Sequence, residues 1–282
     1  MEPQKLHEDV LYTQVRVRAA KAGGSGTVIY SNEGRKGFST FVLTCHHVIE
    51  GALTVKKEYD PRIGMDRKKE YRQVVNVEFF DYESVPHGRR PVSNSVDADI
   101  VAYDNTHDMA LLRLRMSTQA SHVAKLLPEN EIEAVRVGDK SYAVGCALLH
   151  DPILTEGMIT HMGDEIDYND YWMSSAQIIF GNSGGAMFRP DDEGYYFIGV
   201  PSRIDVAGWT DAITHLGYFS PINRVYDFIR SEHYEFIVDP NFTEEQCEKV
   251  REDIKKKAET RRFTPIEEDE PVETEDAMEE VS

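Results

Sequence analysis

The residues most able to do chemistry in this sequence are a serine and the glycines around it. Gly181-Asn182-Ser183-Gly184-Gly185 has the composition of a tight turn, because glycine supplies backbone freedom that other residues lack. Such a turn can present the hydroxyl of Ser183 as a nucleophile. The N–H groups of Gly181 and Ser183 would then stabilise the oxyanion that forms after attack. Taken alone, the segment is also compatible with a plain glycine turn.

A serine hydroxyl is a weak nucleophile unless a base takes its proton. The segment 41–51, FVLTCHHVIEG, places His46 and His47 together at the end of an apolar strand. Neighbouring side chains of an extended chain face opposite ways, so only one of them can face a shared cleft. A histidine in this place can also be structural. The sequence has no second ligand pair at a usual zinc spacing, and we therefore predict no metal site.

An acid is then needed to hold the tautomer of the imidazole. The candidates are Asp97, Asp99, Asp104 and Asp108. Asp108 directly precedes the apolar run MALLRL, and an acid before a buried strand can be fixed and desolvated. By itself it is a common acid between a turn and a strand. The three segments lie far enough apart in sequence to come from different strands or loops and to meet across a cleft.

Most of the chain reads as short strands separated by turns, which is typical of a sandwich or barrel. The strands form two groups, separated by the polar stretch 116–135, and we therefore expect two lobes. The first group comprises segments 13–17, 26–30, 38–43, 74–80, 99–103 and 110–115. The second comprises segments 140–144, 158–160, 172–174, 186–188, 195–200 and 217–220.

Three further segments differ from this pattern. The basic stretch 56–72 has no regular period and is predicted to be a loop insertion, either solvated or in contact with substrate or partner. Thr243 and Gln246 fit a capping box that begins a terminal helix. Segment 267–282 has nine acidic residues and no basic one, so we expect a disordered tail. That tail is either a solubilising end or a docking or autoinhibitory element.

Composition bounds the class of protein. The chain has 282 residues, enough for two modest lobes, and its net charge of -19 argues against a nucleic-acid partner. Its three cysteines are odd in number and widely spaced, which favours a reducing compartment such as the cytoplasm. The start of the chain has no apolar core of a signal peptide, and no apolar run is long enough to span a membrane. We expect a cytoplasmic protein, or one of a host cytoplasm or particle if viral, with no membrane partner.

Three motifs together resemble those of trypsin-like peptidases, most closely the HtrA-like branch: TCHHVIEG, DMALLRL and GNSGGAMF. Their order, His then Asp then Ser, is that of chymotrypsin. The resemblance implies two antiparallel β-barrels followed by a C-terminal helix and the acidic tail. It identifies His47 and not His46 as general base, Asp108 as its orienting acid and Ser183 as nucleophile. The oxyanion hole would be Gly181 and Ser183.

Weaker matches extend the resemblance over residues 20–230. They are Gly24-Ser25-Gly26 and the segments 137–145 and 217–221. The expected domains are a first barrel at 1–125, a second at 126–235, and the helix and tail at 236–282. The chain departs from HtrA proteins in having too few residues after 230 for a PDZ domain. It departs from digestive trypsins in having Asn182 before the nucleophile, so we expect no activation by cleavage of the N-terminus.

The resemblance also implies a primary substrate pocket. Its walls would be Gln177, Ile178, Ile179, Phe180, Val200, Gly217 and Phe219. No acid falls where a trypsin selects basic residues, so an apolar or small P1 side chain is predicted.

These inferences predict a serine endopeptidase that cleaves a protein or peptide through an acyl-enzyme, without a cofactor and in an unspecified oligomeric state. The alternative is a catalytically degenerate fold that acts as a binding or structural module. An α/β-hydrolase esterase is disfavoured, because its histidine would come last in the chain.

Overall fold

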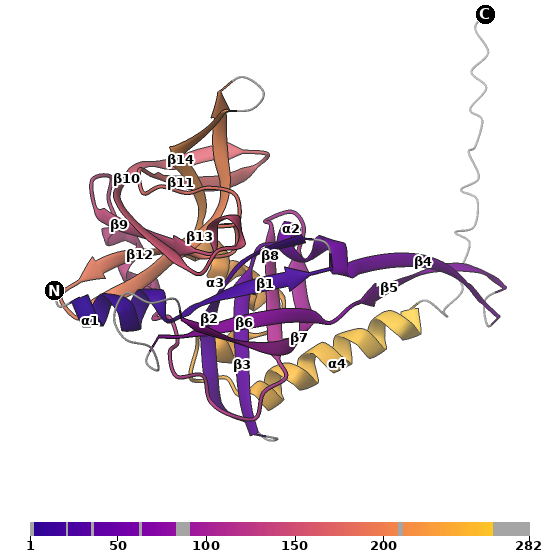
Figure 1. Cartoon of the computed structure of the whole chain (residues 1–282). Helices are drawn as coiled ribbons and strands as arrows, with labels where there is room; N and C mark the ends of the chain where they lie inside the picture. Colours follow the sequence, from indigo (N-terminus) through magenta and orange to yellow (C-terminus); the bar gives the residue numbers. More distant parts are fainter. Residues whose placement is uncertain are drawn as a thin grey trace, which may run out of the picture.

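The computed structural model describes residues 3–20, 22–34, 37–61, 64–82, 91–207 and 211–261. It contains two closed antiparallel barrels, as predicted (Figure 1). The first has the order β1-β2-β3-β8-β7-β6 and closes where β1 pairs with β6. Its strands are β1 (Gln14–Ala19), β2 (Ala22–Gly34), β3 (Gly37–Thr44), β6 (Val75–Asp81), β7 (Val92–Asp104) and β8 (Met109–Leu114).

The second barrel has the order β10-β11-β14-β13-β12-β9 and closes where β9 pairs with β10. Its strands are β9 (Lys140–Gly145), β10 (Ile153–Ile166), β11 (Asn169–Ser174), β12 (Ala186–Asp191), β13 (Gly194–Ala207) and β14 (Asp211–Pro221). Every strand segment predicted from the sequence falls in or next to one of these strands. The domain limits at 125 and 235 remain predictions.

The core explains why several strands read as continuous apolar runs. In β8, the residues from Met109 to Leu112 are all fully buried, because one face lines the barrel and the other is covered by neighbouring segments. Phe188, Phe197 and Phe219 fill the second barrel in the same way, each with no exposed surface. Burying an aromatic or branched side chain of this size stabilises a fold by roughly 1.5–3 kcal/mol.

The helices lie outside the barrels. They are α1 (Pro3–Leu6) with the π-helical turn His7–Leu11, α2 (His46–Ile49), α3 (Ile222–Ser231) and α4 (Glu244–Arg261). The 3₁₀ turns are η2 (Glu50–Ala52), η3 (Glu129–Ala134), η4 (Ala147–Leu149) and η5 (Glu235–Ile237). No helix of the described segments is long and apolar enough to cross a membrane.

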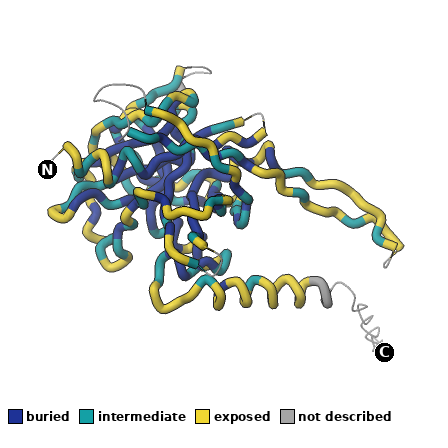
Figure 2. The backbone as a smooth tube through the Cα atoms, turned by 60° about the horizontal axis from the view of Figure 1, so that its bottom comes forward, coloured by how far each residue is buried: buried dark blue, intermediate teal, exposed yellow. Residues whose placement is uncertain are grey.

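The terminal helix begins as its capping box predicts. The N–H of Thr243 donates to Oε1 of Gln246 at 2.9 Å, and the N–H of Gln246 donates back to Oγ1 of Thr243 at 3.3 Å. Cys247 is buried near the start of α4, whereas the later turns of the helix are exposed (Figure 2). The acidic segment 267–282 lies outside the described residues.

The prediction for segment 56–72 was wrong. Instead of an irregular loop, β4 (Leu53–Asp60) and β5 (Met65–Arg72) pair as a long antiparallel ribbon that leaves the first barrel (Figures 1 and 2). The sequence hides this ribbon because most of its side chains face solvent and no buried face imposes an apolar alternation. Lys56 lies opposite Lys69, and Lys57 lies opposite Lys68.

Candidate active site

His47 and Asp108 form a pair: His47 lies in α2, which follows β3, and Asp108 directly precedes β8. Nδ1 of His47 lies 2.7 Å from Oδ2 of Asp108, and the N–H of His47 donates to Oδ1 at 2.9 Å. Both carboxylate oxygens are therefore engaged by one residue. Asp108 has a φ of 53°, in the left-handed region, where a short polar side chain is tolerated better than a bulky one.

The neighbouring histidine has a different environment. His46 is buried, and its ring lies 5.1 Å from that of Tyr103. The His47 side chain is 44% exposed, so only this imidazole is open to a bound molecule. The structure thus pairs with Asp108 the histidine that the sequence motif selected, and its catalytic role stays a prediction.

The other candidate acids are engaged elsewhere. Asp99 forms an ion pair with Arg115 at 2.6 Å, and Asp104 contacts Nδ1 of His107 at 2.5 Å. Asp97 faces Asn76 in the register of β7 and β6. Of the four acids considered, Asp108 is the one that reaches His47.

The serine turn is closed by its own residues. The N–H of Asn182 donates to the Ile179 carbonyl at 3.0 Å, and the N–H of Ile179 donates to Oδ1 of Asn182 at 3.1 Å. The side chain of Asn182 is buried, so this amide closes the turn from inside. The N–H of Gly185 donates to the Asn182 carbonyl at 2.8 Å.

The turn packs against the strand end that carries His47. A Cβ on Gly184 would lie 2.3 Å from Oγ1 of Thr44 and 2.9 Å from the N of Cys45, so only glycine fits this approach. His47 follows two residues later. The structure therefore brings the serine, histidine and aspartate segments together where the two barrels meet.

The hydroxyl of Ser183 makes no hydrogen bond to another described residue. Within the described part of the chain, the N–H groups of Gly181 and Ser183 have no acceptor either. Catalytic hydrogen bonds to a nucleophile are often loose without substrate and tighten when it binds. An oxyanion hole requires N–H groups that no internal acceptor occupies, and these two N–H groups belong to the serine turn itself.

Cys45 is a buried neighbour of the pair. Its thiol, His47 and Asp108 place their ligand-type atoms within 4.8 Å of one another. A tetrahedral zinc ion bound at about 2.0–2.2 Å would hold its ligand atoms more than about 3 Å apart. The 2.7 Å contact between His47 and Asp108 is that of a hydrogen bond instead. Burial, and then the charge of Asp108, raise the pKa of the Cys45 thiol well above its usual value.

The residues of the predicted substrate pocket differ in burial. Val200 and Phe219 lie in the core, and Phe219 packs edge-on against Trp172 at 5.9 Å between ring centroids. Gln177 and Phe180 are exposed, and the Ile179 N–H is part of the serine turn. The cavities described, of about 320, 560 and 630 Å³, lie elsewhere and are lined by none of the triad residues.

The two remaining wall residues, Ile178 and Gly217, pack against each other. Its side chain is 2% exposed, and a Cβ on Gly217 would lie 2.5 Å from Cδ1 of Ile178. The N–H of Ile178 donates to the Thr214 carbonyl at 2.8 Å, which holds this segment against β14. The side chain beside Gly217 is therefore apolar and tightly packed.

Sequence reasoning missed the residues that support the serine turn. Ser25 was noted only as part of a weak motif, and Arg16 and Leu148 carried no motif at all. Ser25 contacts the turn through both its hydroxyl and its N–H. The only signal for it was the pair of flanking glycines, which permit such a close approach.

Two closed antiparallel barrels, with a histidine–aspartate pair on one and a serine turn on the other, define the architecture of the chymotrypsin-type peptidases. The chain belongs to the trypsin-like peptidase family, whose domain model matches residues 24–200. Its similarity is to the HtrA-type branch of that family, as the sequence motifs indicated.

Two relatives illustrate this similarity. The serine endoprotease DegS of Haemophilus influenzae is 25% identical over 143 residues, which cover 49% of this chain and 39% of DegS. The HtrA-type protease AlgW with a tripeptide has a TM-score of 0.55 at 19% identity, covering 82% of this chain and 63% of AlgW. AlgW with a decapeptide has a TM-score of 0.56 at 17% identity, covering 82% and 67%. The chain thus spans less than two thirds of DegS and of the first AlgW chain.

Proposed function

We propose that this protein is a serine endopeptidase that hydrolyses peptide bonds through an acyl-enzyme. The observation that carries the proposal is the placement of the His47–Asp108 pair beside a serine turn with two unpaired N–H groups. Membership of a peptidase family supports it independently. A degenerate binding module has no need of this combination.

The mechanism follows from these atoms. Asp108 accepts a hydrogen bond from Nδ1–H of His47, which leaves Nε2 as the basic nitrogen. Nε2 takes the proton of Ser183 as Oγ attacks the substrate carbonyl. The N–H groups of Gly181 and Ser183 stabilise the resulting oxyanion.

The tetrahedral intermediate then collapses. The imidazolium of His47 gives its proton to the leaving amine, and the acyl group stays on Oγ of Ser183. Water enters, loses a proton to Nε2 and attacks the ester carbonyl. The second collapse returns the proton to Oγ and releases the acid product.

The substrate is a protein or peptide with a small or apolar P1 residue. Ile178 packs against Gly217 in the predicted pocket wall, and Gln177 rather than an acid stands near the position where a trypsin selects basic side chains. The two AlgW structures contain peptides, which agrees with this substrate class for a related fold. We place the protein in a reducing compartment such as the cytoplasm, because Cys45, Cys146 and Cys247 are all unpaired.

Hydrolysis of a peptide with a small P1 residue tests the proposal. Ser183→Ala and His47→Ala should each abolish turnover to a similar extent, because members of a triad act as a unit. His46→Ala is the matched control and should retain turnover. Full activity of Ser183→Ala would contradict the mechanism, and a folded wild-type protein without activity would favour the binding module.

A further inference from the structure

Ser25 is a fully buried residue of the first barrel that holds the serine turn of the second. Its Oγ–H donates to the Gly181 carbonyl at 2.6 Å, and Oγ accepts the N–H of Cys146 at 2.6 Å. The N–H of Ser25 donates to the Ser183 carbonyl at 2.9 Å. One residue thus fixes a carbonyl on each side of Asn182.

A second contact fixes the peptide before Gly181. The N–H of Leu148 donates to the Phe180 carbonyl at 2.7 Å. In a planar trans peptide the N–H points opposite to the carbonyl, so this bond turns the N–H of Gly181 away from Leu148. The bond from Gly185 to the Asn182 carbonyl orients the N–H of Ser183 by the same geometry.

The turn has no space in which to shift towards its support. Gly181 has a φ of +97°, and a Cβ there would lie 2.6 Å from the N of Leu148 and 2.7 Å from the Cys146 carbonyl oxygen. The segment that carries Leu148 is itself strained, because Leu148 and Leu149 have φ values of 51° and 60°. Such conformations persist only where surrounding contacts hold them.

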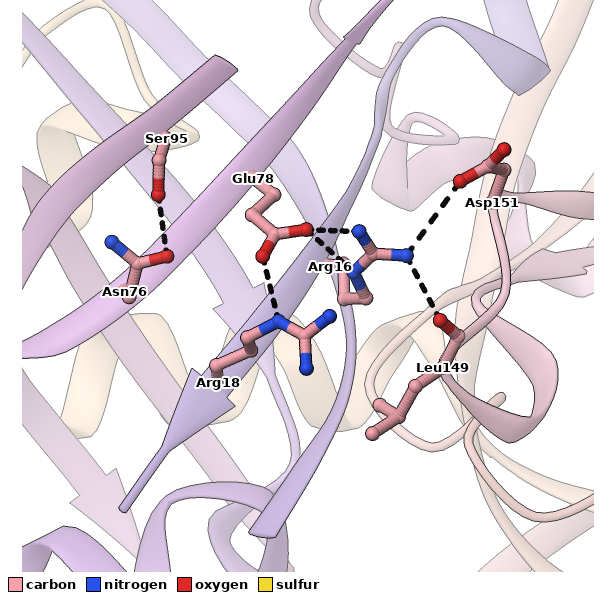
Figure 3. Close-up of polar contacts among 7 residues, drawn as sticks. All are labelled: Arg16, Arg18, Asn76, Glu78, Ser95, Leu149 and Asp151. Atoms are coloured by element: carbon pink, nitrogen blue, oxygen red, sulfur yellow. Dashed lines mark hydrogen bonds and ion pairs between the residues drawn. The ribbon is translucent and has the colours of Figure 1, made fainter. Parts of the chain in front are cut away.

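Arg16 supplies those contacts from the first barrel (Figure 3). Its Nη1 donates to the Leu149 carbonyl at 2.8 Å and lies 3.6 Å from Oδ1 of Asp151. Its Nε donates to Oε2 of Glu78 at 2.7 Å, so the guanidinium is held by its own barrel while it reaches the other. The Arg16 side chain is 7% exposed, which shields these bonds from water.

We propose that Ser25 and Arg16 are positioning residues that hold the Gly181 N–H in the orientation that binds the oxyanion. Ser25 acts directly on the Gly181 carbonyl, and Arg16 acts through the segment that carries Leu148. Neither residue touches the reacting atoms. The inference rests on the proposed peptidase function and adds that the first barrel sets the oxyanion hole of the second.

The predicted effect falls on kcat. Ser25→Ala leaves the Gly181 carbonyl and the Cys146 N–H without partners. The Gly181–Asn182 peptide then loses its fixed orientation, and with it the Gly181 backbone that carries the N–H. Loss of one oxyanion-hole donor lowers kcat by about 10²–10³-fold. We therefore expect Ser25→Ala to lower kcat by at least about tenfold and at most by that amount, with KM little changed. Arg16→Met should lower kcat by a smaller factor.

Two matched controls are present in the same strands. Ser31 in β2 is also a buried serine whose Oγ contacts Thr40 at 2.7 Å and accepts the N–H of Ala120 at 2.9 Å, far from the turn. Arg18 in β1 also binds Glu78, at 2.6 Å, but does not reach Leu149 (Figure 3). Ser31→Ala and Arg18→Met should lower thermal stability without changing kcat.

Two readouts separate positioning from stability. Affinity for a peptide boronate, which resembles the tetrahedral intermediate, should fall in parallel with kcat in Ser25→Ala and stay constant in Ser31→Ala. Amide hydrogen exchange should become faster for the segments around Leu148 and Gly181 in Ser25→Ala and Arg16→Met only. The exchange experiment needs no activity. It therefore tests whether Ser25 and Arg16 hold the serine turn even if the proposed function fails.

Unchanged kcat and unchanged boronate affinity in a folded Ser25→Ala protein would overturn the inference. So would exchange around Gly181 that is no faster than in Ser31→Ala. Inactivity of the wild-type protein would instead refute the peptidase function. The exchange result would then decide alone whether Ser25 and Arg16 hold the serine turn.

Discussion

At the scale of single residues, the structure pairs His47 with Asp108 and places a small-residue turn opposite. The motif around Ser183 predicts that turn, because glycines are needed where backbones approach within van der Waals contact. The same motif says nothing of Ile178, whose side chain occupies the space beside Gly217. In the proposed peptidase, this one apolar side chain would limit the size of the P1 residue.

Ile178→Ala is predicted to enlarge the primary pocket. Removing the branched side chain frees the space above Gly217, so kcat/KM for peptides with a large apolar P1 residue should rise relative to small ones. The ratio should change by roughly tenfold, the discrimination that one or two methylene groups give. A panel of peptides that differ only at P1 measures it. An unchanged ratio would show that Ile178 does not face the substrate.

At the scale of elements, sequence predicts strands where burial imposes a pattern and fails where it does not. Most strands of both barrels have buried apolar runs, although β10 buries only Ile159, and the sequence predicted a strand segment for each of them. The capping box of α4 was also readable, because Thr243 and Gln246 act locally. The β4–β5 ribbon could not be predicted from the sequence, because it has no buried face. The contact of Ser25 with Gly181 could not be predicted either, because the two residues lie far apart in sequence.

The ribbon carries a testable conflict of charges. Lys57 and Lys68 face each other across the strands, and like charges in that position destabilise a pair. Lys68→Glu should convert this repulsion into attraction and slow amide exchange along the ribbon, while turnover of a short peptide stays constant. Lys68→Gln, which only removes a charge, should give a smaller effect. Faster exchange in the Glu variant would contradict this account.

At the scale of the whole molecule, the burial of a thiol and a phenol makes the free energy of unfolding depend on pH in the alkaline range. Burial raises the pKa of the Cys146 thiol to about 12 and, with the Glu129 charge, that of Tyr226 to about 12. In the unfolded chain a thiol ionises near about 8.5 and a phenol near about 10. Since the unfolded state loses these protons first, their stabilising contribution is complete below pH of about 8.5 and declines as pH rises towards about 12.

The free energy of unfolding should therefore fall with pH above about 8.5, measured by denaturant titration at several pH values. Cys146→Ala should make this decline less steep between about pH 8.5 and 10, because it removes one group that ionises only on unfolding. An unchanged slope would show that the Cys146 thiol does not contribute to it.

The central claim is that Ser183 is an activated nucleophile, and covalent labelling tests it most directly. A fluorophosphonate probe should react with the folded protein at Ser183 alone, as located by peptide mass spectrometry. The rate should rise through neutral pH, since an imidazole must be neutral to accept the serine proton. His47→Ala should abolish labelling, and His46→Ala should not. Absence of labelling in the folded wild-type protein, or a label on another serine, would contradict the account.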